Sequence, residues 1–337
     1  MTDSTADPTA IPAPVDSPDF GVAWHYGDPH REQRELASGV GAVDLSHRGV
    51  VRILGADRLS WLHSLTTAHL ESLGTGGSAL SLILSPHGHV EHELHVVDDG
   101  VATWLSVEPG TVGTLVSYLE SMRFMLRVEP ADVSADFGVV FEPVALQTEL
   151  PTYLLPLEYS RPSSDDRYVP RRPAALVGRE VIVPRSAVAA RVAASGSPAG
   201  TWAFEALRVA AGVPRLGLDT DHRTIPHEVG WVPTAVHLAK GCYRGQETVA
   251  RVYNLGRPPR RLVLLHLDGV SEVLPRTGDE VTLATDPGGV VGRVGTVARH
   301  FEFGPIALAL VKRSVPPDAP LWAGSVAAAQ ETIVVAG

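Results

Sequence analysis

The stretch from which the fold is deduced is Lys240-Gly-Cys-Tyr-Arg-Gly-Gln-Glu-Thr-Val-Ala-Arg251. It contains Cys242, the only cysteine among 337 residues, with one glycine directly before it and another three residues after it. Neighbouring cations favour the thiolate, which is the reactive form of cysteine, so Lys240 and Arg251 would activate Cys242. The alternative is an inert cysteine buried in a turn, because free cysteine is often a small core residue. The density of polar groups around Cys242 favours the reactive interpretation.

The run from Lys240 to Glu247, followed by Ala250-Arg251, resembles the signature of the YgfZ family. That family comprises folate-binding proteins related to the aminomethyltransferase, or T-protein, of the glycine cleavage system. A second region, from Phe204 to Trp231, is similar to a segment that the YgfZ family and the T-protein share. The resemblance covers nearly the whole chain from about Phe20 onward.

The resemblance implies an α+β fold, a three-domain ring of the aminomethyltransferase folate-binding type with a C-terminal antiparallel β-barrel. It implies a discontinuous folate-binding domain (residues 20–50 plus 136–256), a ferredoxin-like α+β layer (51–135) and a small barrel domain (257–337). The preceding segment, 1–19, is rich in Thr, Asp, Ala and Pro, and its composition predicts a disordered tail.

Composition narrows the class of protein. Hydrophobic residues make up 44% and charged residues 20%, as in ordinary soluble globular proteins. The formal net charge of −10 disfavours direct binding to nucleic acid. A single cysteine suits a reducing compartment and cannot supply a four-thiolate iron–sulfur site alone. The sequence shows no apolar run of the ~18 residues that a spanning helix needs and no features of a secretory signal, so we expect a cytoplasmic protein without membrane contact.

Hydrophobic periodicity predicts the secondary structure. We expect helices over residues 29–38, 57–73, 112–122, 186–194 and 197–211, and strands within 43–54 and 79–107, the latter with a hairpin turn at 98–100. The proline-rich segment 141–176, with its polar run 163–166, predicts a loop. After a stiff basic linker at 257–261, short strands are expected over 262–267, 280–283, 293–300, 306–312 and near 332–335. Short strands separated by Gly and Pro turns are typical of a small antiparallel barrel.

The folate site is predicted from the shared segment. A pterin offers a polar edge that the Glu228 carboxylate could pair with, and its ring needs apolar walls such as Phe204 or Trp231. The anionic folate tail needs nearby Arg or Lys. The resemblance places Arg48 and Phe204 where folate-stacking aromatics occur, and a guanidinium can also stack on a ring. We assign folate contacts to Arg48, Phe204, Arg208, Glu228, Trp231, Tyr243, Gln246 and Glu247, and reactive chemistry to Cys242, Lys240 and Arg251. The alternative for Arg208 is a surface ion pair with Glu205, three residues earlier on the same helix face.

Two departures from the T-protein pattern concern catalysis. The T-protein carries an Asp-Asp pair where this chain has His92-Glu93, and a glutamate where this chain has Ala210. Glycine-cleavage transfer is therefore not expected, although Glu93 or His92 could still act as an acid or a base.

Histidines are concentrated in the first third of the chain. Along a strand, His89, Glu91, Glu93 and His95 would share one face. Two imidazoles and two carboxylates could bind zinc or ferrous iron, but alternation alone also produces a solvated polar face. We assign no metal ligands.

The function that follows from the resemblance is that of a tetrahydrofolate-binding accessory protein, more a factor than an enzyme, in iron–sulfur cluster assembly or repair. Cys242 would act on a cluster, a persulfide or a partner among cluster-assembly or client proteins, with indirect effects on tRNA modification. Two alternatives stay open: a tetrahydrofolate-dependent one-carbon (aminomethyl) transferase, and a non-catalytic interaction module.

Overall fold

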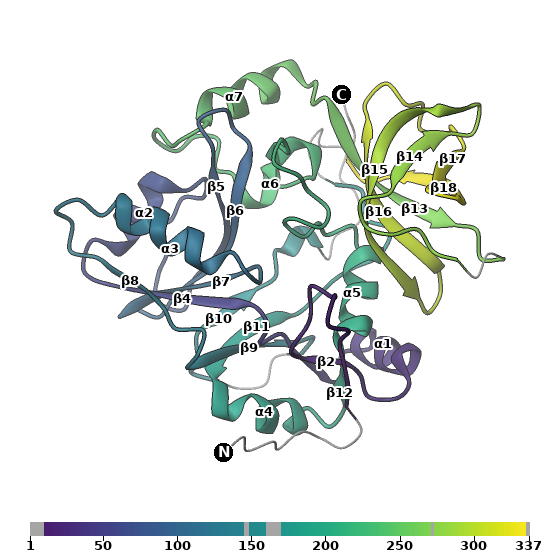
Figure 1. The fold of residues 1–337 in the computed structure, drawn as a ribbon. Coiled ribbons are helices and arrows are strands. Elements are labelled where there is room, and N and C mark those ends of the chain that lie inside the picture. Colours follow the sequence, from purple (N-terminus) through teal and green to yellow (C-terminus); the bar gives the residue numbers. More distant parts are fainter. Residues whose placement is uncertain (1–9, 145–147, 160–169, 271–272, 335–337) are drawn as a thin grey trace. The chain divides into compact units, whose positions relative to one another are not determined.

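The computed structural model describes residues 10–144, 148–159, 170–270 and 273–334 (Figure 1). The chain divides into two compact units. The first contains Met1–Leu82, His92–Leu155 and Val177–Phe204, and the second contains Ile83–Glu91, Pro156–Leu176 and Glu205–Gly337. The domain bounds that the family resemblance implies stay predictions.

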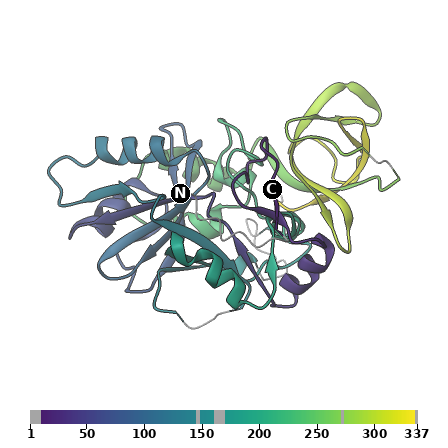
Figure 2. The same ribbon diagram turned by 60° about the horizontal axis from the view of Figure 1, so that its bottom comes forward.

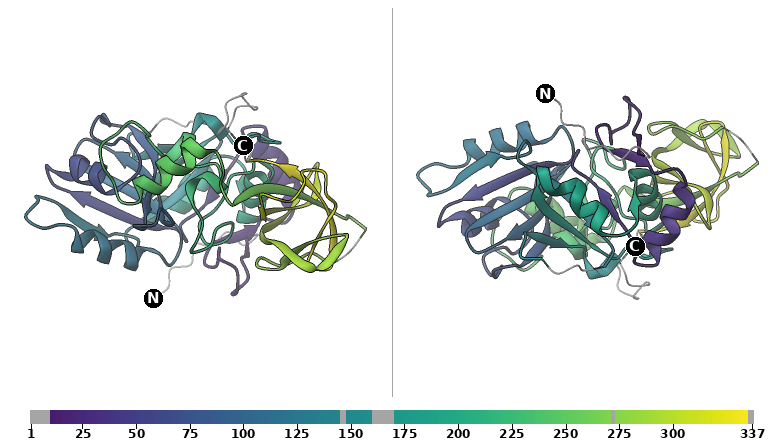
Figure 3. Two further views of the ribbon diagram at one scale, coloured as in Figure 1. Left: turned by 90° about the horizontal axis from the view of Figure 1, so that it is seen from above. Right: turned by 90° about the horizontal axis from the view of Figure 1, so that it is seen from below.

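One sheet of the first unit contains the expected hairpin, which joins its strands β6 and β7. Its strand order is β5-β6-β7-β4-β8, with β4 (Gly49–Leu54), β5 (Ser78–Leu84), β6 (Val90–Asp98), β7 (Ala102–Val107) and β8 (Glu129–Asp132). The predicted turn after β6 is present, because the Asp99 carboxylate accepts hydrogen bonds from the backbone N–H groups of Val101 and Ala102. Helices α2 (Arg58–Leu65) and α3 (Val112–Ser121) accompany this sheet, and Figure 3 shows α3 lying against it.

A second sheet has the order β10-β11-β9-β3-β12. Its strands are β3 (Ala42–Asp44), β9 (Phe137–Glu142), β10 (Thr152–Leu154), β11 (Arg179–Pro184) and β12 (Pro198–Ala199). Helix α4 (Val188–Ala194) contributes Val188 and Val192 to a core that includes Val140, Val181 and Val183. Helix α1 (Pro29–Ala37) begins as expected, with the Asp28 carboxylate accepting the Arg31 N–H and proline in the first turn.

The second unit contains helix α5 (Thr201–Ala210, which starts in the first unit), the 3-10 turn η3 (Pro226–Glu228), α6 (Val232–Ala235), α7 (Gln246–Leu255) and the barrel. The barrel closes in the order β13-β16-β15-β14-β17-β18 and appears as a ring of strands in Figure 2. These strands are β13 (Arg260–Leu267), β14 (Glu280–Leu283), β15 (Asp286–His300), β16 (Gly304–Lys312), β17 (Leu321–Ala323) and β18 (Val326–Thr332). Alternate residues of β13 and β16, such as Val263, Leu265, Ala307 and Ala309, fill its interior. The predicted antiparallel barrel is confirmed.

Several predicted element bounds are wrong. Helix α2 ends at Leu65, well before 73, because Thr66 adopts an extended conformation and its hydroxyl bonds back to the Leu62 carbonyl. Pro198 lies in β12, which pairs with β3, and does not start the next helix. In the barrel, β17 was not predicted, and the last strand runs over Val326–Thr332, earlier than expected.

Two further expectations concern segments taken as irregular. The linker prediction fails at Arg260, which opens β13 and pairs with Lys312 of β16. The predicted tail is ordered where it is described, because Ile11–Pro12 forms β1 and pairs with β2 (Ala23–His25). The polar run 163–166, the segment 1–9 and residue 335 lie outside the described residues. In the described ranges, none of the helices has the length and apolar character needed to span a bilayer.

Candidate functional site

The signature loop presents Cys242 to solvent. Its thiol is free and the residue is exposed, between α6 and α7. The next residue, Tyr243, is buried, and burial raises the pKa of its phenol to about 12. The Lys240 ammonium lies 5.3 Å from the centre of the Tyr243 ring, and Lys240 is itself only 6% exposed. The structure thus excludes the buried alternative for Cys242, and the roles assigned to Lys240 and to the exposed Arg251 stay predictions.

The tip of the β5–β6 hairpin holds this loop by close backbone packing within the second unit. Gly245 has a φ of +83°, and a side chain there would lie 2.7 Å from the Ser85 carbonyl oxygen. Gly88 has a φ of +80°, and its added Cβ would lie 2.8 Å from Thr248 Cβ. Both glycines are therefore required by the approach of two chain segments. The signature glycine at 245 serves the start of α7, whose first residues are the predicted folate contacts Gln246 and Glu247.

An ion pair reinforces the same contact. Arg244 Nη1 donates to Glu91 Oε2 at 3.0 Å, and both side chains are about one-third exposed (34% and 38%). An exposed pair contributes little stability, in the range of about 0–1 kcal/mol, so the pair adds orientation more than energy. The hairpin is also tied to the chain before η3, since the Val90 N–H donates to the Thr224 carbonyl at 2.8 Å.

Glu228 is fully buried and already satisfied by the chain. Its carboxylate accepts from the Ile225 N–H at 3.1 Å and from Arg260 Nε and Nη2, each at 2.8 Å. Arg260 also pairs with Asp221. Burial would raise the pKa of the Asp221 carboxyl, but the Arg260 guanidinium outweighs burial and lowers it. Sequence reasoning missed Arg260 as a partner, because it was assigned to a linker and lies 32 residues from Glu228. The predicted pairing of Glu228 with a pterin stays a prediction.

Arg208 is the centre of a buried network. It donates to both Glu205 oxygens at 3.0 and 2.7 Å, to Asp219 at 2.9 Å and to the Thr296 hydroxyl at 2.7 Å. Burial would lower the pKa of Arg208, but Glu205 and Asp219 raise it. The predicted ion pair with Glu205 is present, but its surface location is wrong, because Arg208 is 2% exposed and ties α5 to the barrel strand β15.

The two predicted aromatic walls lie in hydrophobic surroundings. Phe204 is 4% exposed and its ring centre lies 4.8 Å from that of Phe141. Trp231 is fully buried, and its indole N–H has no acceptor among the described residues. A buried donor of this kind is rare in a folded protein and fits a polar ligand edge.

In the first unit, Arg48 belongs to a buried charge cluster. Its Nη1 donates to Glu180 at 2.9 Å and its Nη2 lies 3.7 Å from Glu108. His95 donates to the other Glu180 oxygen at 2.8 Å and stacks on Tyr153, with ring centres 4.3 Å apart. Burial disfavours the charged ring of His95, but Glu180 outweighs it and raises the pKa to about 9. Burial would likewise raise the pKa of Glu180, yet Arg48 and His95 lower it to about 2.

The cluster corrects the expectation of a solvated face on β6. Of that face, Glu91 is exposed, whereas Glu93 is 7% exposed and His95 is covered by its partners. On the other face, burial lowers the pKa of His92 to about 4, so this ring is neutral at physiological pH. The pair His92-Glu93 is therefore a neutral imidazole followed by a nearly buried acidic side chain.

Comparison with known proteins places these features in context. No family model matches the chain. A chloroplastic protein of Arabidopsis thaliana, named as a presumed transferase, is 30% identical over 270 residues, which cover 75% of this chain and 62% of that protein. The aminomethyltransferase of Chromobacterium violaceum is 28% identical over 251 residues, covering 70% of this chain and 69% of the relative. The mitochondrial homologue of the iron–sulfur cluster assembly factor IBA57 in Mycosarcoma maydis is 24% identical over 235 residues, covering 65% of this chain and 55% of that protein.

The fold is shown by a solved structure. The glycine cleavage system aminomethyltransferase T from Bartonella henselae superimposes with a TM-score of 0.74 at 15% identity, covering 96% of this chain and 93% of that one. The chain has the fold of the glycine cleavage T-protein, so the predicted fold class is confirmed. The chain spans less than two thirds of the plant transferase and of the assembly-factor homologue. Its similarity in sequence is to aminomethyltransferase-like proteins.

Proposed function

We propose that this chain is a tetrahydrofolate-binding protein of the YgfZ type that acts through Cys242 in the assembly or repair of iron–sulfur clusters. The observation that carries the proposal is the exposed, free thiol of Cys242 within the signature loop. The loop is held against the β5–β6 hairpin by glycine packing that a side chain would disrupt. The similarity to a cluster assembly factor homologue supports the same function.

A single thiolate can supply one ligand to a cluster, so the remaining ligands must come from another protein. An exposed position suits this shared ligation, because a partner needs access to the sulfur. The partners would be cluster-assembly or client proteins. Where clients include enzymes that modify tRNA, loss of Cys242 would affect tRNA modification indirectly.

The folate part of the proposal rests on the second unit. Tetrahydrofolate, when bound, would supply a reduced pterin able to carry one-carbon units. Trp231 would donate its indole N–H to the ligand, and Glu228 would hold the surrounding chain through Arg260. Similarity to aminomethyltransferases supports a folate ligand. The contacts assigned to Arg48, Phe204, Arg208, Tyr243, Gln246 and Glu247 stay predictions.

The test separates the thiol from the folate. In a deletion strain, wild-type protein should restore the activities of cluster-containing enzymes, whereas Cys242→Ser should not. Purified Cys242→Ser should bind tetrahydrofolate as the wild type does in calorimetric titration, because the thiol is not needed for the pocket. Full restoration by Cys242→Ser would contradict the role of the thiol, and absence of folate binding in the wild type would contradict the ligand.

A second candidate is a tetrahydrofolate-dependent aminomethyl transferase, which the sequence similarity to enzymes of that name favours. The pair His92-Glu93 and the residue Ala210 argue against it, since the acidic groups of the T-protein pattern are replaced there. Turnover of an aminomethyl donor by purified protein in the presence of tetrahydrofolate would establish this candidate. We expect none.

A further inference from the structure

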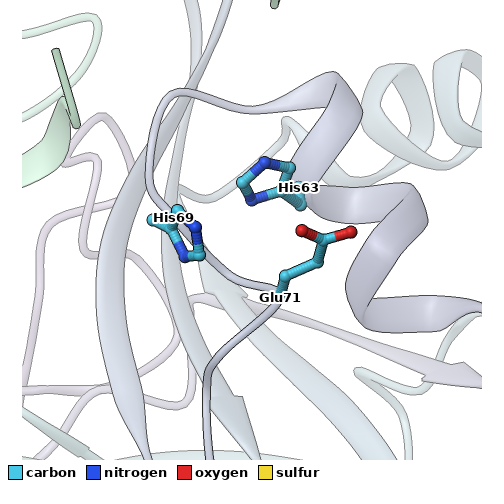
Figure 4. Close-up of side chains that lie close together, drawn as sticks. All are labelled: His63, His69 and Glu71. Carbon is cyan, nitrogen blue, oxygen red and sulfur yellow. The ribbon is translucent and has the colours of Figure 1, made fainter. Parts of the chain in front are cut away.

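Three side chains of metal-ligating type lie close together within the first unit, one on the last turn of helix α2 and two on the loop that follows it (Figure 4). One possible ligand atom from each of His63, His69 and Glu71 lies within 4.8 Å of the others. The His63 and His69 rings meet edge to face, with centres 4.6 Å apart. His63 is partly buried, and His69 and Glu71 are exposed, so an ion could reach them from solvent. No other group of His, Cys, Asp or Glu in the described ranges meets the same spacing.

The loop that carries two of the ligands is anchored on strand β5. The Thr67 N–H donates to the Leu82 carbonyl at 3.0 Å, and the Leu82 N–H returns a bond to the Thr67 hydroxyl at 2.9 Å. The Ala68 N–H donates to the Ser81 hydroxyl at 3.0 Å. Leu70 is fully buried between His69 and Glu71, which fixes the chain on either side of it. The backbone that carries His69 and Glu71 is therefore held before any ion binds, which lowers the entropy cost of binding.

One ring is oriented as metal-binding histidines commonly are. His69 Nδ1 lies 3.1 Å from the Ser72 hydroxyl, an outer contact of the kind that orients metal-binding histidines. Metal binding by the His63 ring would cost one hydrogen bond. The Leu70 N–H donates to His63 Nδ1 over a long 3.3 Å, and this bond would be given up when the ring binds an ion.

We propose that His63, His69 and Glu71 form a binding site for Zn²⁺. Two imidazoles and one carboxylate are a ligand set that zinc accepts, with a fourth position left for water or another ligand. Calcium and magnesium require mostly oxygen ligands, which this set does not provide. The site is independent of the proposed folate and cluster function, because it shares no residue with it.

The test is a titration of Zn²⁺ into the full chain carrying Cys242→Ser, so that the thiol cannot bind the ion. We expect one Zn²⁺ ion to bind tightly to each chain. His69→Gln and Glu71→Gln should each weaken the affinity for this ion about tenfold or more. Both residues are exposed, so these variants should keep the melting temperature of the metal-free protein. His30→Gln, which changes an exposed histidine on α1, is the matched control and should bind zinc unchanged.

Cobalt provides a second readout. Co²⁺ bound in the same site should give a d–d absorption spectrum of nitrogen and oxygen ligation that the double variant His69→Gln/Glu71→Gln lacks. If the double variant binds zinc as tightly as its parent, the site does not exist.

Discussion

At the scale of single residues, Glu180 is the centre of the buried charge cluster in the first unit. It is 2% exposed and holds two cationic groups, Arg48 at 2.9 Å and His95 at 2.8 Å. Taking one partner from a buried ion pair leaves an uncompensated charge, which commonly costs about 3–5 kcal/mol. Such a carboxylate therefore stabilises the sheet only because both partners are present.

We expect Glu180→Gln to lower the free energy of unfolding by about 3–5 kcal/mol, because Arg48 and His95 would lose their counter-charge. Urea denaturation followed by circular dichroism measures this change. The control is Glu129→Gln, which alters an exposed glutamate on β8 and should change stability by less than about 0.5 kcal/mol. Equal effects of the two variants would mean that the cluster contributes no net stability.

His95 and Glu180 also make the stability of the folded chain depend on pH. The pKa of His95 is about 9 in the folded chain against 6.5 for an unperturbed histidine, so the folded state holds more protons between these values. Its contribution is complete below pH 6.5 and is lost as pH rises through 9. Glu180, with a pKa of about 2 against 4.5, contributes fully above pH 4.5 and loses its contribution as pH falls toward 2. The pair thus stabilises most between pH 4.5 and 6.5.

Wild-type stability should therefore decline by a few kcal/mol between pH 7 and pH 9 through His95, within the scale set by 1.36 kcal/mol per pKa unit. In Glu180→Gln this decline should nearly vanish, since the ring loses the carboxylate that keeps it charged. Urea midpoints measured across this pH range for both proteins provide the comparison. Parallel pH profiles would show that His95 is not the titrating group.

At the scale of elements, the β5–β6 hairpin and helix α7 illustrate what the sequence could reveal. The turn at Asp98–Gly100 is a local pattern and was predicted correctly, whereas β6 is buried on both faces over most of its length. The glycine at 245 is part of the signature run, but the sequence does not reveal its partner Gly88. That pairing depends on segments more than 150 residues apart, which periodicity does not report.

The same limit explains the other misjudged elements. Leu73 extends the apparent apolar stripe of α2, although the chain after Thr66 is a loop packed on β5. Pro198 has the character of a helix start, yet it pairs with β3 through tertiary structure. Arg260 was read as part of a linker, because only the fold brings it to Glu228. Of the candidate site, the exposure of Cys242 and the pairing of Arg208 with Glu205 agree with the sequence argument, whereas the partners of Arg48 and Glu228 could not be inferred from it.

We expect Gly88→Ala to destabilise the contact between the β5–β6 hairpin and helix α7 by more than the strain of a positive φ alone. The matched control is Gly76→Ala, because Gly76 has a similar φ of +76° but nothing within 4 Å of an added Cβ, whereas Gly88 would meet Thr248 at 2.8 Å. Both variants incur the left-handed penalty of about 1–2 kcal/mol, and only Gly88→Ala adds the clash. We expect Gly88→Ala to be the less stable and to increase the rate at which Cys242 reacts with a thiol reagent.

Comparable stability and comparable thiol reactivity in Gly88→Ala and Gly76→Ala would contradict this account. The loop that carries Cys242 would then be positioned by its own turn, and the hairpin would have no part in it. The comparison is informative because φ is nearly equal at the two glycines, so the difference isolates the packing contact.

At the scale of the whole molecule, the fold is shared with the T-protein while the chemical groups differ. A TM-score of 0.74 at 15% identity shows that the architecture tolerates extensive substitution. Fold alone does not establish function, which depends on specific side chains. The two proposed functions, aminomethyl transfer and thiol chemistry, therefore have to be distinguished by side chains such as the exposed Cys242. Folate binding is the property that both possibilities share.

Tetrahydrofolate should therefore stabilise the whole chain, since a ligand that binds only the folded state adds RT ln(1 + [L]/Kd), or about 2.7 kcal/mol at 100 times its Kd. The melting temperature should rise with tetrahydrofolate in the wild type and in Cys242→Ser. Trp231→Phe keeps an aromatic core residue but removes the buried N–H, so its ligand-induced rise should be smaller, measured against its own ligand-free melting temperature. Trp322→Phe changes a partly exposed barrel residue and should respond as the wild type does. An equal rise in the melting temperature of Trp231→Phe would show that the indole does not contact the ligand. If tetrahydrofolate raises the melting temperature of none of these proteins, folate is not a ligand of this chain.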